Sequence, residues 1–123
     1  MTHRKFDLDM LAAQGLGTRP YKEGEKIFTN GDPGDCMYVV ESGAVNIVNF
    51  GSVLDNIKPG DIFGEMSLID GSPRSANAVA GEPTKVIAVD QDAFLKLVAH
   101  DPKFSLQVMR RLAERLRDMN ENV

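Results

Sequence analysis

The sequence predicts one mainly β domain that ends in helices, and three observations support this fold class. The chain has 123 residues, enough for a single hydrophobic core, so residues 1–123 are expected to form one domain. A series of glycines from Gly17 to Gly81 recurs with gaps of 7 to 12 residues, the turn spacing of a sandwich or barrel of short strands. The last forty residues contain no glycine and only Pro102, and their apolar residues follow a helical period instead.

Composition narrows the class of protein before any motif is considered. Apolar residues make up 42% and charged residues 26% of the chain, which is ordinary globular usage. The net charge is −4, the wrong sign for a protein that binds nucleic acid through its phosphates. The chain shows neither a long apolar stretch nor the apolar core of a secretory signal, so we expect a cytoplasmic protein without a membrane segment. The single cysteine, Cys36, has apolar neighbours and is expected to fill core space.

The first two thirds of the chain supply one short helix and then strands. Residues 6–16 place Phe6, Met10 and Leu11 close together, which predicts a short amphipathic helix that Gly15 interrupts. Five later segments are rich in β-branched or aromatic residues and are bounded by turn residues. The predicted strands are Cys36–Val40, Ala44–Phe50, Val53–Ile57, Arg74–Ala80 and Lys85–Val89.

Two helices are predicted after the last strand. Asp90 can cap the first helix, which is expected to end near His100. Asp101 and Pro102 then begin a second helix, because a capping side chain is followed by the residue that suits the first helical position. A helix from there to about Asn120 would be roughly 28 Å long, enough to cross the whole β unit.

The second of these helices has an apolar face and a charged face. The apolar stripe has intervals of 3, 4, 3 and 4 residues, and either the β unit or a second copy of the chain could cover it: Met109, Leu112, Leu116, Met119 and Val123. The charged face is interpreted as a solvated surface with ion pairs along the helix: Arg110, Arg111, Glu114, Arg115, Arg117 and Asp118.

One segment inside the β region, residues 60–80, is expected to carry the chemistry. A turn at Gly64 leads into one or two helical turns from Glu65. The start of a helix leaves backbone N–H groups free for an anion, and Arg74 adds a forked cation nearby. A phosphate would repel Glu65, so this carboxylate is expected to accept hydrogen bonds from neutral groups such as sugar hydroxyls. The segment therefore predicts a pocket for a phosphate and a ribose.

Motifs in and before this segment resemble a known family. Residues 63–68 read Phe-Gly-Glu-Met-Ser-Leu, and residues 74–80 read Arg-Ser-Ala-Asn-Ala-Val-Ala. Together they resemble the phosphate-binding cassette of the cyclic nucleotide-binding domains, a family that includes the bacterial catabolite activator protein and the regulatory subunits of protein kinase A. Residues 31–43 are similar to the family's glycine-cornered hairpin. The resemblance implies a double-stranded, jelly-roll-like β-roll over about 17–90, with a short N-terminal helix before it and C-terminal helices over about 91–120.

The resemblance also implies which residues contact the ligand. Arg74 would bind the cyclic phosphate with help from Ser75 and Ala76, while Glu65 and the Gly64 backbone would hold the ribose 2′-hydroxyl. The other cassette positions expected in the site are Phe63, Met66 and Ser67. In the family the last helix covers the base, and the candidates for that contact are Arg111, Leu112, Arg115, Leu116, Met119 and Asn120. Family members that prefer guanine often have threonine after the cassette arginine, so Ser75 favours cAMP and leaves cGMP as the alternative.

The implied function is a sensor, a regulatory module that binds a cyclic nucleotide and repositions its last helix. The alternative is a scaffold or dimerisation module without a ligand, in which Arg74 and Glu65 could form a surface ion pair. An enzyme, a metal site or a cofactor is not expected, because the chain has two histidines and no nucleophile with a base nearby. Specific DNA binding by this chain is not expected either, since no helix pair for reading a groove follows. Phe28, where the family more often has a smaller aliphatic residue, is expected to affect packing only.

Overall fold

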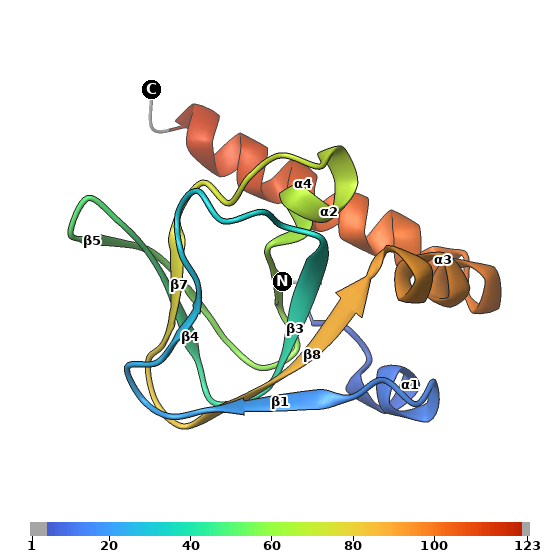
Figure 1. Cartoon of the computed structure of the whole chain (residues 1–123). Coiled ribbons are helices and arrows are strands. Elements are labelled where there is room, and N and C mark those ends of the chain that lie inside the picture. Colours follow the sequence, from blue (N-terminus) through green and yellow to red (C-terminus); the bar gives the residue numbers. More distant parts are fainter. Residues whose placement is uncertain (1–4, 122–123) are drawn as a thin grey trace.

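Within residues 5–121, eight strands form two antiparallel four-stranded sheets that pack face to face as a β-roll (Figure 1). The computed structural model describes residues 5–121, with side chains as far as Met119. One sheet has the order β1-β8-β3-β6 and the other β2-β7-β4-β5. The strands are β1 (Thr18–Tyr21), β2 (Lys26–Phe28), β3 (Cys36–Ser42), β4 (Val45–Asn49), β5 (Ser52–Ile57), β6 (Ile62–Phe63), β7 (Asn77–Ala80) and β8 (Thr84–Asp90). The helices are α1 (Leu8–Ala13), α2 (Glu65–Asp70), α3 (Gln91–His100) and α4 (Lys103–Glu121). This architecture confirms the predicted fold class.

Strand β3 separates two hydrophobic cores, because successive side chains of a strand point to opposite faces of its sheet. Cys36, Tyr38 and Val40 belong to an inner core between the two sheets. Met37 and Val39 belong to an outer core between the sheet and the helices. Both faces of β3 are therefore buried, which explains why its sequence is continuously apolar rather than alternating.

Helices α1, α3 and α4 cover the outer face of the β1-β8-β3-β6 sheet (Figure 1). The ring of Phe104 on α4 meets Phe6 edge-on at 5.7 Å and Phe94 at 5.4 Å. Asp90 caps α3 as predicted, since its carboxylate accepts a hydrogen bond from the Ala93 N–H at 2.8 Å. These contacts fix the first half of α4 on the roll, and its second half contacts β6 and α2 through Arg115.

Three features of the chain path differ from the predicted elements. Strand β7 begins at Asn77 rather than at Arg74, because the Arg74 backbone pairs with the loop before β3. There the Arg74 N–H donates to the Asp32 carbonyl, and the Arg74 carbonyl accepts from the Gly31 N–H, both at 2.8 Å. Helix α1 is shorter than predicted, and α4 begins one residue after Pro102. Strands β1, β2 and β6 were not predicted, since two to four residues are too few to show a period.

Candidate functional site

A cavity of about 290 Å³ lies between α2, the strands near it and the second half of α4. It is near the lower end of the volumes typical of small-molecule sites. All eight cassette positions expected to contact a ligand line this cavity: Phe63, Gly64, Glu65, Met66, Ser67, Arg74, Ser75 and Ala76. Their contact with a ligand stays a prediction. Four lining residues on the strands were not predicted: Phe28, Ile47, Asp55 and Ile57. The last three lie on predicted strands, where the two-residue spacing of one strand face was the available signal. Phe28 lies on β2, which is too short to show a period.

Arg74 is a buried cation at the wall of this cavity, with 4% of its surface exposed. Its Nη1 donates to the Gly64 carbonyl at 2.8 Å, and its Nη2 donates to the Cys36 carbonyl at 2.7 Å. Its Nε is buried and has no hydrogen-bond partner within residues 5–121. No carboxylate of the described residues forms an ion pair with Arg74. The guanidinium is thus held by neutral acceptors, without an anionic side chain paired to it in the part of the chain that the structure describes.

Two aromatic rings support the Arg74 guanidinium. Its Cζ lies 4.2 Å from the centre of the Phe28 ring and 5.7 Å from the centre of the Tyr38 ring. Such cation–π contacts contribute about 0.5–2 kcal/mol. Burial, and then the neighbouring Cys36, raise the pKa of the Tyr38 hydroxyl, so this ring stays uncharged. The expectation that Phe28 affects packing only is wrong, because its ring holds the guanidinium and lines the cavity.

The loop before β3 packs closely against the cassette residues Ser67 and Arg74. A Cβ at Gly34 would lie 2.4 Å from the Ser67 Cβ and 2.8 Å from the Arg74 Nε. Real Cβ atoms do not approach other atoms this closely, so the loop requires glycine there. Gly64 is restricted in the same way, with φ of 75° and a Cβ position 2.7 Å from the Arg74 Nη1. Both glycines let the backbone close around the arginine.

Glu65 begins α2 and is as deeply buried as Arg74, but the two side chains do not pair. The Glu65 Oε2 instead accepts a hydrogen bond from Arg115 Nη1 of α4 at 2.5 Å. Arg115 Nη2 also donates to the Ile62 carbonyl at 2.5 Å. The surface ion pair considered between Arg74 and Glu65 is therefore not formed. The carboxylate expected to hold the ribose is linked to the last helix.

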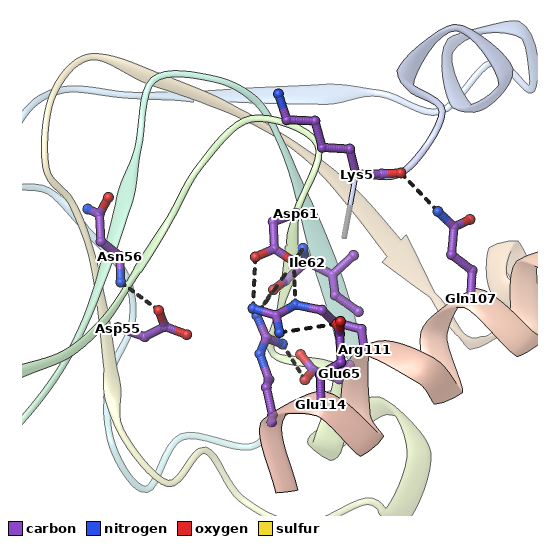
Figure 2. A network of polar contacts seen from close by, with 10 residues as sticks. Lys5, Asp55, Asn56, Asp61, Ile62, Glu65, Gln107, Arg111 and Glu114 are labelled. Atoms are coloured by element: carbon purple, nitrogen blue, oxygen red, sulfur yellow. Dashed lines mark hydrogen bonds and ion pairs between the residues drawn. The ribbon is translucent and has the colours of Figure 1, made fainter. Parts of the chain in front are cut away.

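A second arginine of α4 is buried one helical turn earlier (Figure 2). Arg111 donates from Nε and Nη2 to the two oxygens of Asp61 at 2.8 and 3.0 Å. Burial alone would lower the pKa of Arg111, but the hydrogen bonds and charge of Asp61 raise it above its ordinary value. Glu114 Oε1 lies 3.6 Å from the Arg111 Nη1. The interpretation of this helix face as a solvated surface is wrong for Arg111 and Arg115, because both point into the roll.

The structure divides the six candidates for covering the base into different groups. Arg115 and Met119 line the cavity. Arg111 is engaged with Asp61, and Leu112 packs against the outer core. Leu116 is 56% exposed and does not line the cavity, and the side chain of Asn120 lies outside the described part of the chain. Contact of any of them with a base stays a prediction.

Two other kinds of site are not found where the structure describes the chain. No group of three or more histidine, cysteine, aspartate or glutamate side chains within residues 5–121 could hold a metal ion. Over the same residues, none of the helices combines the length and the apolar character that a bilayer span requires.

Comparison with known proteins gives the family. The family model of the cyclic nucleotide-binding domain matches residues 18–101. A CRP-like cAMP-activated global transcriptional regulator of Mycobacterium tuberculosis is 34% identical over 108 residues, which cover 84% of this chain and 48% of that protein. The chain thus spans about half the length of this relative.

Two solved structures share the fold. The catabolite activator protein of Thermus thermophilus has a TM-score of 0.83 and 35% identity, over 94% of this chain and 58% of that chain. A structure described as "A cyclic-GMP-dependent signalling pathway regulates bacterial phytopathogenesis" has a TM-score of 0.79 and 31% identity, over 94% and 98% of the two chains. Because the family model matches two thirds of this chain's length, the chain belongs to the cyclic nucleotide-binding domain family.

Proposed function

We propose that this chain is a cytoplasmic regulatory module that senses a cyclic nucleotide, with cAMP as the favoured ligand. The observation that carries the proposal is Arg74, a buried guanidinium at the cavity wall with no carboxylate partner among the described residues. A buried charge without a counter-charge is costly, and a bound anion would remove that cost. The phosphate diester of a cyclic nucleotide carries one negative charge, which matches the single charge of Arg74.

Arg74 and Glu65, two of the charged residues that line the cavity, suit different parts of this ligand. Arg74 would take the phosphate, with the neighbouring Ser75 and Ala76 adding contacts. Glu65 lines the same cavity and would repel a phosphate, so it suits the ribose 2′-hydroxyl, which donates a hydrogen bond. A ligand that carries a charged ester beside a free hydroxyl fits both groups. Inorganic phosphate would fit only one.

Ligand binding would reach the last helix through Arg115. This arginine holds Glu65, so a ribose that binds Glu65 changes the environment of the Arg115 guanidinium. Because Arg115 lies on α4, a new position for its side chain favours a new position for the helix. The shift in helix position can be no larger than the ligand's differential affinity for the two arrangements.

The base preference rests on the walls of the cavity away from Arg74. The apolar side chains of Ile47, Ile57 and Met119 offer a surface for either purine. Ser75 and the cAMP-activated relative favour cAMP. Asp55 also lines the cavity and favours cGMP as a second candidate, because a carboxylate can accept both N–H groups on one edge of guanine.

Calorimetric titration with cAMP, cGMP and 5′-AMP tests the proposal. We expect saturable one-site binding of a cyclic nucleotide and much weaker binding of 5′-AMP, whose phosphate carries more charge and is not tied back to the sugar. Tighter binding of cGMP than of cAMP would replace the favoured ligand with the second candidate. No heat with either cyclic nucleotide at millimolar concentration would contradict sensing and favour the ligand-free scaffold.

We also propose that α4 pairs with a second copy of the chain. Met109, Leu116 and Met119 are each more than half exposed and follow one face of this helix. Light scattering with and without cAMP should show a dimer in at least one of the two states, and Leu116→Glu should shift it toward the monomer. A monomer in both states would contradict the pairing. We expect no specific DNA binding by this chain alone.

A further inference from the structure

Two asparagines outside the cavity hold one backbone oxygen of the cassette. Asn49, at the end of β4, donates from Nδ2 to the Ser75 carbonyl at 3.1 Å. Asn30, in the loop after β2, donates from Nδ2 to the same carbonyl at 3.4 Å and to the Asn49 Oδ1 at 3.2 Å. Asn30 is itself tied to β7, because its backbone N–H donates to the Asn77 Oδ1 at 2.8 Å. Two side chains from separate elements thus converge on one carbonyl and on each other.

Because a peptide group is planar, the hydrogen bonds to the Ser75 carbonyl also fix the direction of the Ala76 N–H. The Ser75 carbonyl and the Ala76 N–H belong to the same trans peptide, so they point in opposite directions. The preceding peptide is held in the same way, since the Arg74 carbonyl accepts from the Gly31 N–H at 2.8 Å. Within the described residues, neither the Ser75 N–H nor the Ala76 N–H donates to a protein acceptor, and both residues line the cavity. Ala76 is also buried, where an N–H group normally has a partner.

We propose that Asn30 and Asn49 are positioning residues for phosphate binding, which fix the Ser75–Ala76 peptide so that the Ala76 N–H is presented to the ligand's phosphate. The proposal rests on the proposed function, because it requires a cyclic nucleotide in the cavity. Neither asparagine lines the cavity, so both act through the backbone and not by contact with the ligand. Because this N–H is free and already oriented, little free energy is spent on ordering it when a phosphate oxygen binds.

The test compares Asn30→Ala and Asn49→Ala with a matched control. Asn56→Ala removes an asparagine from the same sheet whose Nδ2 donates to the Asn46 Oδ1 at 2.7 Å and not to the Ser75 carbonyl. Calorimetry would measure the affinity of each protein for cAMP and for the two phosphorothioate diastereomers of cAMP. Sulfur is a poor acceptor, so the diastereomers report separately on the donor that faces each exocyclic oxygen of the phosphate.

Asn30→Ala and Asn49→Ala should each bind cAMP about two- to tenfold more weakly, the equivalent of one net hydrogen bond. The ratio of the two diastereomer affinities should change by a similar factor, whereas a general loss of stability would leave that ratio unaltered. Asn56→Ala should match the wild type within twofold in both measurements. In the wild-type protein, the amide proton of Ala76 should move downfield in nitrogen–proton NMR spectra when cAMP is added.

Two results would overturn the proposal while leaving the proposed function intact. One is a wild-type protein that binds cAMP without any change at the Ala76 amide. The other is that Asn30→Ala and Asn49→Ala both keep the wild-type ratio of the two diastereomer affinities. A wild-type protein that binds neither cAMP nor cGMP would remove the proposed function itself, and the inference with it.

Discussion

Arg111→Met is the substitution that best tests how α4 is held on the roll. Arg111 and Asp61 are 4% and 9% exposed, and two hydrogen bonds of 2.8 and 3.0 Å join them. Methionine keeps most of the apolar stem but leaves the Asp61 carboxylate buried without its partner. Breaking a buried pair costs about 3–5 kcal/mol. Asp61 would retain the Ile62 N–H at 2.8 Å and Arg115 at 3.7 Å, so we expect the lower end, about 3 kcal/mol.

Urea unfolding followed by circular dichroism measures this loss directly, and the thermal midpoint should fall by about 12 °C. Arg110→Met is the matched control, since Arg110 is an exposed arginine on the same helix and should change the free energy of unfolding by less than about 0.5 kcal/mol. Adding Asp61→Asn to Arg111→Met should recover at least about 1 kcal/mol, because position 61 then carries no buried carboxylate that has lost its partner. The reasoning would be refuted if the free energy of unfolding of Arg111→Met lay within about 1 kcal/mol of the wild type. It would also be refuted if the double variant were no more stable than Arg111→Met.

Three further substitutions test the cavity and its walls. Arg74→Ala should weaken cAMP binding by about 3–5 kcal/mol, or roughly 200- to 5,000-fold, and calorimetry that finds a loss below threefold would show that the pocket is misplaced. Glu65→Gln should weaken binding less than Arg74→Ala, because the amide oxygen still accepts a hydroxyl; the opposite order in the same titration would reverse their roles. Gly34→Ala should destabilise the fold, since its Cβ would lie 2.4 Å from the Ser67 Cβ, whereas Gly17→Ala meets nothing within 4 Å. Equal thermal midpoints for the two glycine variants would contradict the close approach of the loop.

Local patterns were enough to predict most of the fold. The glycine spacing marked the turns of the roll, and the change of period after Val89 marked the two C-terminal helices. The turn at Gly64 and the short helix after it were also readable, because both depend on residues next to one another in the chain. Strand β6 was not readable, because two residues are paired there only by the neighbouring β3.

The charged residues of α4 show where such prediction ends. Arg110, Arg111 and Arg115 are chemically alike in the sequence, and a helical face rich in charge is normally solvated. Their different roles depend on partners about fifty residues earlier, Asp61 for one and Glu65 for another. No local pattern encodes a contact over that distance.

The sequence by itself determined the β-roll with its trailing helices and the cassette positions that gather at one cavity, because turns, periods and motifs act over a few neighbouring residues. Only the tertiary structure decided that Arg74 rests on Phe28, with no carboxylate partner among the described residues, and that Glu65 is held by the last helix. Burial and the pairing of charges are properties of the packed chain, since they depend on which distant side chains exclude water from each site.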